Sequence, residues 1–569
     1  MQDKTPPQGK VNVVLYWHMH QPEYRDLRNG QYQLPWTYLH TIKDYVDMVA
    51  HLEAYPKARA VVNFAPILLE QILDYKEQLN GFLDQGRALR DPLLAALADP
   101  VISNNPEKRL SLVKDCLRAN EQHLVKRYPQ YHRLAELARA SLDDNDILQY
   151  FSDQFYIDLL VWYHLAWLGE TVRMSDERVQ ALQNKGEIFS LHDRRLLLEL
   201  IRDLVQGVLP RYQKLAEQKR IELSFTPYAH PIMPLLLDIE SAREAVPDIA
   251  LPEAKVYPGG EQRSRWHIDK GLQVFEQCFG MQPAGCWPSE GGISEATLEL
   301  LAEKGIAWTA SGETVLRNSL HASGMDTLHC IHQPFKLHGV HTTCFFRDDG
   351  LSDHIGFKYA DWRSGDAVAN MVHHIENIAS ACGKDESTII SIILDGENAW
   401  EYYPNNGYYF LSHLYEVLSS HKQIKLTTYS EYLQQQYEPI PLKHIVAGSW
   451  VYGSFTTWIG DTDKNRAWDM LVDAKQVYDS VIASGKLSAE QSQQAEQQLA
   501  ICEGSDWFWW FGDYNPADSV ESFDEQYRIH LCNLYHLLGE SPPEYLSQGF
   551  SHGNGAPAMG GVMLPGKQH

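Results

Sequence analysis

Two carboxylates stand where their side chains could carry out acid–base chemistry. Glu290 ends the segment Trp287-Pro-Ser-Glu290 before two glycines, and Asp395 ends an apolar run before Gly396-Glu-Asn-Ala-Trp400. Each therefore lies at a turn with an indole nearby. Such a pair can cleave a glycosidic bond, with one group attacking or activating and the other donating a proton. Because an isolated acidic turn residue is more often a helix N-cap, the pair needs support from the rest of the chain.

Two histidines follow the first strand-like segment. Residues 11–17 are mostly apolar, and His18 and His20 come directly after them. Side chains two positions apart in a strand point the same way, so both imidazoles face one side. Together with Asp395 they could hold a catalytic zinc ion with an open position. That arrangement leaves Glu290 without a task, so we predict neither a metal ligand nor a cofactor.

Two kinds of sequence segment alternate along the chain and carry these residues. Short β-branched runs end in polar residues, and long amphipathic segments lie between them, which is typical of an α/β domain. Roughly seven β–α units are expected, and a parallel barrel of such units has its active site at the carboxyl ends of the strands. The predicted strands include residues 11–17, 61–64, 221–225, 306–310, 341–346 and 388–394.

The helical segments define the predicted domains. A barrel domain is expected over residues 1–430, interrupted by a helical insertion at about 91–219. Beyond residue 440 the strand pattern stops, and three helices predict an all-α domain over 440–546 that contributes to the cleft. The Gly/Pro-rich residues 547–569 are expected to form a loose tail.

Composition excludes several classes of partner. The 569 residues contain 49 Lys+Arg against 74 Asp+Glu, a net charge of -25, which disfavours nucleic acid and anionic membrane surfaces. Residues 1–10 lack the apolar core of a secretion signal, so a cytoplasmic location is expected. The 8 cysteines are scattered and are predicted to be free thiols. The 15 Trp, 30 Tyr and 18 Phe residues suit stacking on an uncharged ligand.

Five segments in order resemble glycoside hydrolase family 57, whose members act on α-glucans. This resemblance implies an incomplete (β/α)7 barrel followed by a helical domain, in agreement with the strand pattern. The matching segments are His18-Met-His-Gln-Pro22, Ile221-Glu222 with Thr226-Pro-Tyr-Ala-His-Pro231, Cys286-Trp-Pro-Ser-Glu290, Leu394-Asp-Gly-Glu-Asn-Ala-Trp-Glu401 and Trp458-Ile-Gly-Asp-Thr-Asp-Lys-Asn-Arg-Ala-Trp468.

The resemblance also implies roles for individual residues. Glu290 is expected to be the nucleophile and Asp395 the general acid/base of a retaining double displacement. The apolar strand before Asp395, and the acidic Glu397 and Glu401 after it, are both expected to raise the pKa of the proton donor. The predicted substrate-binding residues are His18, His20, Glu222, His230, Trp36, Trp287, Trp400 and Trp458.

The resulting hypothesis is a cytoplasmic α-amylase-type enzyme that acts on α-1,4-glucans. A 4-α-glucanotransferase or an amylopullulanase of the same family is the alternative, since the sequence does not separate water from a sugar acceptor. A metal-dependent carbohydrate deacetylase and a non-catalytic glucan-binding protein are further alternatives. An α-glucan is the expected partner, and the sequence assigns no oligomeric state.

Overall fold

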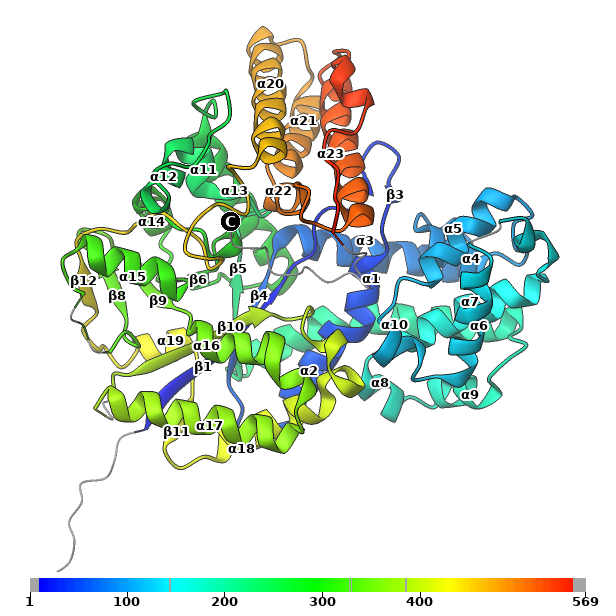
Figure 1. Ribbon diagram of the computed structural model, residues 1–569, viewed down its shortest axis with the longest axis horizontal. Helices are drawn as coiled ribbons and strands as arrows, with labels where there is room; N and C mark the ends of the chain where they lie inside the picture. Colours follow the sequence, from blue (N-terminus) through cyan, green and yellow to red (C-terminus); the bar gives the residue numbers. More distant parts are fainter. Residues whose placement is uncertain (1–9, 143–144, 327, 329, 384–385, 556–569) are drawn as a thin grey trace, which may run out of the picture.

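The computed structural model describes residues 10–142, 145–326, 328, 330–383 and 386–555. Its centre is a curled sheet of mostly parallel strands with helices around it (Figure 1). Among the described residues, the parallel strands that form the barrel wall follow the order β10-β1-β4-β5-β6-β7-β9. They are β1 (Val11–Met19), β4 (Ala60–Phe64), β5 (Ile221–Phe225), β6 (Gly285–Cys286), β7 (Trp308–Ser311), β9 (Thr343–Phe346) and β10 (Ile389–Asp395).

Among the described residues, no regular ladder joins the two ends of this wall. An isolated parallel bridge joins Arg347, just after β9, to Ser391 of β10. The other neighbouring strands of the wall are joined by regular ladders or, at β6, by short ones. The predicted incomplete parallel barrel is therefore confirmed.

Alternation along β1 explains how the barrel forms. Val13, Leu15 and Trp17 pack in the large core outside the sheet, whereas Val14 and Tyr16 belong to a separate cluster inside it. Because side chains alternate between faces, a strand buried on both sides must be apolar at nearly every position. The same alternation places the side chain at position 18 above the inner cluster.

The remaining strands lie at the margins of the sheet. β8 (Phe335–Leu337) is antiparallel to β9, β12 (Ile440–Leu442) pairs with β8, and β11 (Ile424–Leu426) pairs with the start of β1. A separate hairpin joins β2 (Arg25–Asp26) to β3 (Gln31–Tyr32). The helices around the barrel are α1 (Trp36–His40), α2 (Val46–Ala54), α3 (Pro66–Gln85), α11 (Met233–Leu237), α12 (Ala242–Ala245), α13 (Gly260–Phe279), α14 (Glu295–Glu303), α15 (Glu313–Ala322), α16 (Asp349–Asp353), α17 (Ser364–Ala381), α18 (Tyr408–Ser420) and α19 (Tyr429–Leu433).

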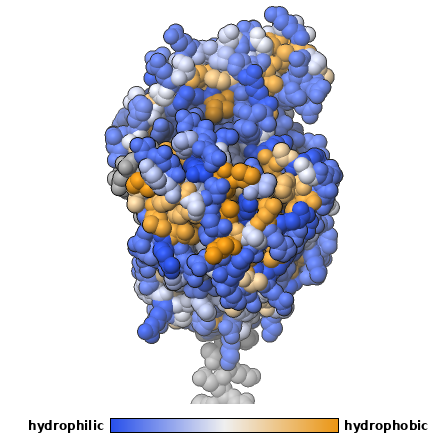
Figure 2. Space-filling view, turned by 90° about the vertical axis from the view of Figure 1, so that its right-hand side faces the viewer, coloured by the Kyte–Doolittle hydropathy of each residue, from blue (hydrophilic) through white to orange (hydrophobic). Residues whose placement is uncertain are grey.

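A helical insertion separates β4 and α3 from β5, as predicted. It occupies the right-hand side of Figure 1, and Figure 2 views that side, where apolar side chains appear among hydrophilic ones. Exposed apolar residues of the insertion include Val101 and Ile188. Its helices are α4 (Pro92–Ala98), α5 (Pro106–Cys116), α6 (Pro129–Ala140), α7 (Asp153–Ala166), α8 (Glu170–Ser175), α9 (Glu177–Lys185) and α10 (Leu191–Glu217).

A group of C-terminal helices lies at the top of Figure 1. It contains α20 (Thr462–Ser484), α21 (Ala489–Cys502), α22 (Ser505–Trp510) and α23 (Ala517–Leu537). Glu503 joins this group to the barrel, because its carboxylate accepts hydrogen bonds of 2.8 Å from Arg263 and 2.7 Å from His267 of α13. The domain boundaries at 430, 440 and 546 stay a prediction.

The start of the expected loose tail differs from the prediction. Phe550 and Ser551 are buried, and their backbone N–H groups donate to a carboxylate oxygen of Asp524 at 3.0 Å and 3.4 Å. Packing against α23 therefore holds residues 547–555 in place. Residues 556–569 lie outside the described residues. So do residues 1–9, in the segment where we predicted no secretion signal.

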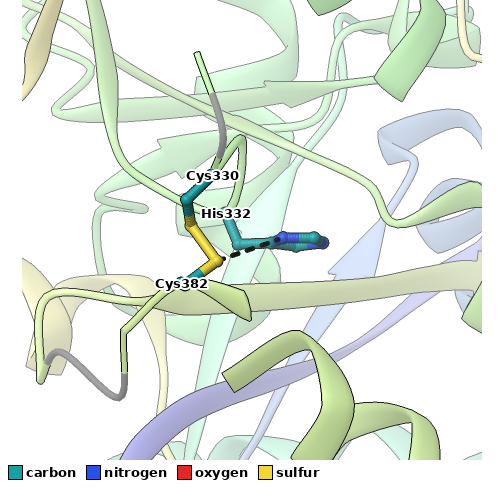
Figure 3. Close-up of side chains that lie close together, drawn as sticks. All are labelled: Cys330, His332 and Cys382. Atoms are coloured by element: carbon teal, nitrogen blue, oxygen red, sulfur yellow. Dashed lines mark hydrogen bonds between the residues drawn. A yellow bond between two sulfur atoms is a disulfide. The ribbon is translucent and has the colours of Figure 1, made fainter. Parts of the chain in front are cut away.

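The prediction of free cysteines is wrong for one pair. Cys330 and Cys382 are joined by a disulfide, with their Cα atoms 5.1 Å apart (Figure 3). The sequence separation of 52 residues hides this proximity, which arises because α17 returns to the segment before β8. In the part of the chain that the structure describes, no helix has the length and apolar character needed to cross a membrane.

Candidate active site

A cavity of about 710 Å³ at the carboxyl ends of the barrel strands holds both predicted catalytic carboxylates. The register between β1 and β10 pairs His18 with Asp395, the last residue of β10. Glu290 comes four residues after β6, in the 3-10 turn η5 (Ser289–Gly291). These three residues and His20 line the same cavity. The fold thus brings together side chains that are separated by up to several hundred residues in the chain.

Glu290 lies in a conformation that side-chain-bearing residues rarely adopt. Its φ is 56° and its ψ is 27°, in the left-handed region. Such a backbone costs on the order of 1 kcal/mol or more and persists where surrounding contacts enforce it. Gly291 follows with φ 57°, and a Cβ at this position would come within 3.0 Å of the Trp287 indole. This tight turn directs the Glu290 carboxylate into the cavity.

Trp450 binds Glu290 through both its indole ring and its backbone. Its indole Nε1 donates to Oε2 of Glu290 at 2.9 Å, and its backbone N–H donates to the Glu290 carbonyl at 3.0 Å. The Trp450 ring packs edge-on against Trp287, with centroids 5.2 Å apart, and the Arg347 guanidinium lies 5.3 Å from the ring. Trp450 therefore fixes one oxygen of Glu290 and leaves the other toward His230, whose Nδ1 is 3.9 Å away.

Asp395 has a different set of neighbours. Asn398 donates a hydrogen bond of 2.7 Å from its Nδ2 to Oδ2 of Asp395. Burial raises the pKa of Asp395 to about 6, and the negative charge of Asp506 acts in the same direction. Hydrogen bonding to Asn398 and the nearby His20 and Arg347 act against this rise. Asp395 is thus suited to hold a proton in weakly acidic solution.

Burial, as predicted from the apolar strand, is the largest cause of the raised pKa of Asp395, and the negative charge of Asp506 adds to it. The repulsion predicted between Asp395 and Glu397 appears in the pKa of Glu397, which the negative charge of Asp395 raises. Glu397 and Glu401 are themselves buried, which raises the pKa of Glu397 well above its usual range and that of Glu401 to about 7.

The ionisation of Glu290 and the ionisation of Asp395 depend on each other. Burial raises the pKa of Glu290 well above its usual range, and the negative charge of Asp395 adds to the effect. Two buried carboxyl groups that repel each other do not ionise independently, so the pair retains one proton where separate groups would have lost both. One ionised and one protonated carboxyl group is the state from which a retaining glycosidase begins.

Three histidines stack beside the carboxylates. The rings of His20 and His230 lie 3.8 Å apart between centroids at an angle of 17°, and the His18 ring is 5.3 Å from that of His230. His20 Nε2 is 2.8 Å from an oxygen of Asp506, and His230 Nδ1 is 2.8 Å from Oγ of Ser505. Residues of the C-terminal helical region therefore hold two of these rings.

Burial makes two of these rings neutral. It lowers the pKa of His18 to about 3, and it lowers the pKa of His230 well below its usual range. One nitrogen of His18 lies 2.6 Å from Oδ1 of Asn63, and Nε2 of His230 has no hydrogen-bond partner among the described residues. Neutral rings with one fixed nitrogen can offer the other to a hydroxyl group.

The same residues fit a metal ion poorly. His20, His230 and Asp506 each place a ligand atom within 4.8 Å of the others. Imidazole lone pairs lie in the ring plane, so two nearly parallel stacked rings cannot both aim at one ion. His18 and His20 with Asp395, the zinc set considered from the sequence, do not form such a cluster among the described residues. The arrangement resembles a hydrogen-bonded array for an uncharged polar ligand.

The prediction of tryptophan platforms is wrong for the residues inside the family segments. Trp287, Trp400 and Trp458 are fully buried, and none of them lines the cavity. Trp287 packs below Trp450, and the Trp400 indole donates to the Gly396 carbonyl at 2.8 Å. A sugar cannot stack on a ring that is covered on both faces. These tryptophans instead support the turns that carry Glu290 and Asp395.

Glu222 also lies away from the cavity. Glu222 pairs with Val61 of β4, and Val61 pairs with Tyr16 of β1. Glu222 therefore lies level with Tyr16, two residues before His18 along the strand direction. Its carboxylate accepts hydrogen bonds from the Trp308 indole at 2.7 Å and from the backbone N–H of Ser430 at 2.9 Å. Glu222 therefore ties α19 to the barrel interior, and the prediction that it binds substrate is wrong.

Trp36 lies beside a second, smaller cavity of about 100 Å³. This cavity shares His20 and Asn398 with the main one, and Asp506 and Trp510 also line it. Of the predicted tryptophan platforms, Trp36 is thus the one that lines a cavity next to the carboxylates.

Several lining residues were not predicted from the sequence. Trp450, Asn398 and Tyr402 line the main cavity, and so does Trp509 of α22. Within the aromatic run at 506–511, Trp507 and Phe508 pack in the core, whereas Trp509 lines the cavity. The position of Asn398, three residues after Asp395, could have indicated from the sequence that it lies at the site.

Fold and cavity together define a barrel enzyme that processes carbohydrate. The incomplete parallel barrel, its helical C-terminal region and the carboxylate pair at the strand ends are the features of a glycoside-processing enzyme. A model of glycosyl hydrolase family 57 matches residues 14–443. The chain belongs to this family of enzymes that act on α-glucans.

Solved structures agree at the level of the fold. A GH57-type branching enzyme from Pyrococcus horikoshii is 15% identical, with a TM-score of 0.57, and the match covers 94% of this chain and 93% of that one. A GH57 branching enzyme from Thermococcus kodakaraensis is 14% identical over 93% and 90%, with a TM-score of 0.55. The α-amylase AmyC from Thermotoga maritima is 14% identical over 95% and 96%, with a TM-score of 0.55. A comparison with curated protein sequences found no match.

Proposed function

We propose that this protein is a retaining enzyme that cleaves α-1,4 links in glycogen-like or maltooligosaccharide substrates through a covalent glycosyl-enzyme. The observation that carries the proposal is the pair Glu290 and Asp395 in one cavity, whose coupled ionisation lets the pair share one proton and leaves one carboxyl group ionised. A cytoplasmic location is part of the same proposal.

Each step uses a group that the cavity presents. The ionised Glu290 attacks the anomeric carbon, while Asp395 gives its proton to the departing glycosidic oxygen. Asp395 then takes a proton from the incoming hydroxyl group, whose oxygen displaces Glu290 and restores the original configuration. The Trp450 hydrogen bond keeps Glu290 Oε2 occupied, so Oε1 is the attacking atom.

The histidines beside the carboxylates contribute by holding the sugar. His18 and His20 line the cavity next to the carboxylates, and the buried His230 ring stacks against His20. Their partners Asn63, Asp506 and Ser505 fix the ring orientations. Hydrogen bonds aligned in advance cost little reorganisation in the transition state.

Transfer to a second sugar is the alternative that a specific observation favours. A volume of about 710 Å³ can hold more than one sugar ring, since pockets for drug-sized ligands span about 300–1,000 Å³. Phe357, which is 63% exposed, Tyr402 and Tyr452 also line the cavity and offer aromatic surface for an acceptor. With a sugar acceptor in place of water, the enzyme becomes a 4-α-glucanotransferase or, for a 6-hydroxyl acceptor, a branching enzyme like the two relatives above.

A trapping experiment tests the mechanism. A fluorinated glucosyl fluoride that forms a slow-turnover glycosyl-enzyme should label the peptide containing Trp287 to Glu290, as read by mass spectrometry. An adduct on another carboxylate, or full turnover with no adduct, would contradict the nucleophile assignment.

Product analysis then separates the activities. Maltoheptaose should give shorter oligosaccharides with hydrolysis and both shorter and longer ones with transfer. Debranching of the products reveals new α-1,6 links, and maltotriose released from pullulan reveals amylopullulanase activity. Glucose chains left intact while acetate is released from an acetylated sugar would refute the proposed class.

A further inference from the structure

A cluster of sulfur and imidazole groups lies outside the catalytic cavity. Cys330 and His332 belong to the segment between α15 and β8, and Cys382 is the C-cap of α17 (Figure 3). One ligand atom from each lies within 4.8 Å of the other two, and all three residues are half-buried. Thiolate sulfur and imidazole nitrogen are the ligands of zinc sites in proteins.

His332 is oriented as a metal ligand would be. Its Nε2 lies 2.9 Å from Oδ2 of Asp348, and its Nδ1 faces Cys382 Sγ at 4.0 Å. A carboxylate on one ring nitrogen holds the proton there and leaves the lone pair of the other nitrogen free. Ligating histidines typically have this outer carboxylate partner.

The disulfide does not satisfy that lone pair. A disulfide sulfur carries no proton, so Cys382 cannot donate to Nδ1 of His332 while it is bonded to Cys330. Among the described residues, Cys382 Sγ at 4.0 Å is the polar atom that Nδ1 of His332 contacts. The oxidised cluster therefore leaves an acceptor unused, whereas a metal ion between Nδ1 and the sulfurs would engage it.

We propose that Cys330, His332 and Cys382 form a redox-controlled zinc site, open for metal only when the disulfide is reduced. The two thiolates and Nδ1 of His332 supply three ligands, and water completes a tetrahedral set. Asp348 orients His332 from outside the coordination shell. Two thiolates neutralise the charge of Zn²⁺, which suits a half-buried position in a low-dielectric environment.

The chemistry of the switch balances with a dithiol reductant. A dithiol supplies two electrons and two protons, the Cys330–Cys382 bond breaks, and the reductant becomes a disulfide. Zinc binding then releases the two thiol protons to solvent as the thiolates coordinate. In the reverse direction a small-molecule disulfide accepts two electrons from the thiolates and two protons from solvent to become thiols, while the Cys330–Cys382 bond re-forms and the ion is released.

The site lies against one wall of the catalytic cavity. Asp348 accepts a hydrogen bond of 2.7 Å from the backbone N–H of Leu351 and so caps α16. Its neighbours Arg347 and Asp349 line the cavity. Metal occupancy is nevertheless separate from the proposed catalysis, because no catalytic candidate is among its ligands.

Cobalt provides a direct test on the full-length chain. The protein is reduced with a phosphine, freed of metal, and titrated with Co²⁺ as a spectroscopic substitute for Zn²⁺. We expect about one equivalent to bind, with intense sulfur-to-cobalt charge-transfer absorption and tetrahedral d–d bands. The oxidised protein should show neither signal.

Variants make the test specific. Cys382→Ser should abolish the charge-transfer absorption, and His332→Ala should weaken binding by at least about tenfold while retaining sulfur ligation. Cys532→Ser, which removes a half-buried thiol elsewhere, serves as the matched control and should bind like the wild type. Circular dichroism of each variant shows whether it is folded.

Two results would overturn the proposal. Reduced wild-type protein that binds no more cobalt than folded Cys382→Ser has no such site. Cobalt bound without charge-transfer absorption in the wild type lies on oxygen or nitrogen ligands elsewhere. Neither result bears on the glycosidase activity, which is measured separately by sugar release.

Discussion

The indole nitrogen of Trp450 donates a 2.9 Å hydrogen bond to Oε2 of Glu290, across 160 positions of sequence. The backbone of Trp450 also binds the Glu290 carbonyl, so one loop residue fixes both ends of the proposed nucleophile. Because Glu290 has left-handed backbone angles, this second contact helps to hold a turn that would otherwise relax.

Replacing Trp450 tests this relationship. Trp450→Phe keeps an aromatic ring against Trp287 but removes the donor to Glu290. A hydrogen bond to a charged group contributes about 1.5–3 kcal/mol, so kcat should fall by about 10- to 100-fold. Steady-state kinetics on maltoheptaose measure the effect. Trp362→Phe, a half-exposed tryptophan on the outer surface, is the control, and an equal loss in both variants would contradict the role of Trp450.

The roles of the two carboxylates can be separated by azide rescue. Glu290→Ala and Asp395→Ala should each lose activity by roughly 10³-fold or more. In Glu290→Ala, azide takes the place of the nucleophile and should give a β-glucosyl azide from an activated α-glucoside. In Asp395→Ala, azide attacks the glycosyl-enzyme and should give the α-anomer. Proton NMR of the products distinguishes the two, and the reverse pattern would exchange the assignments.

The activity should depend on the proton that the pair retains. Because burial raises the pKa of Asp395 to about 6, raising the pH through this region removes the catalytic proton and kcat should fall. Substrates with a fluoride leaving group need no proton from the enzyme and supply the comparison. Their rate should not fall as the pH rises through this region. A decline of equal size with both substrate types would assign the proton to another step.

Burial of Asp395 should also cost stability. Its folded pKa of about 6 exceeds the unfolded value of about 3.9, so the penalty is absent below pH 3.9 and complete above pH 6. Asp395→Asn should therefore gain stability relative to the wild type as the pH rises from 4 to 7, by about 1–3 kcal/mol. Denaturant unfolding at several pH values measures this gain. Asp366→Asn, on the exposed face of α17, should show no comparable trend.

For Glu222 we predict a loss of stability without a comparable loss of activity. Glu222→Gln retains one carbonyl acceptor but loses the charge-assisted contacts with Ser430 and Trp308. We expect a loss of about 1–2 kcal/mol in unfolding free energy, with kcat changed less than about threefold. Paired kinetic and unfolding measurements check both parts. A loss of turnover comparable to that of Glu290→Gln would restore Glu222 to the catalytic site.

The residues at strand ends could be predicted because they depend on local pattern. An apolar run such as 388–394 must form a buried strand, and in a parallel barrel its last residue, Asp395, reaches the catalytic rim. The same logic applies to His18 after the first strand. Order along the chain and alternation along each strand are properties that a sequence contains.

Burial of individual rings could not be predicted in this way. The sequence shows that Trp287 adjoins Glu290, but only packing decides that its ring lies beneath the cavity while Trp450 faces it. Glu222 illustrates the same limit, since a difference of two residues along β5 separates the rim from the barrel interior.

By itself, the sequence determined the strands, the helices and the two carboxylates at the ends of parallel strands, because these follow from hydrophobic periodicity and short motifs. Tertiary structure alone decided the partners. Trp450 against Glu290, Asp506 against His20, and Cys330 against Cys382 each join segments far apart in the chain. Such contacts depend on how the whole chain packs and have no local signal.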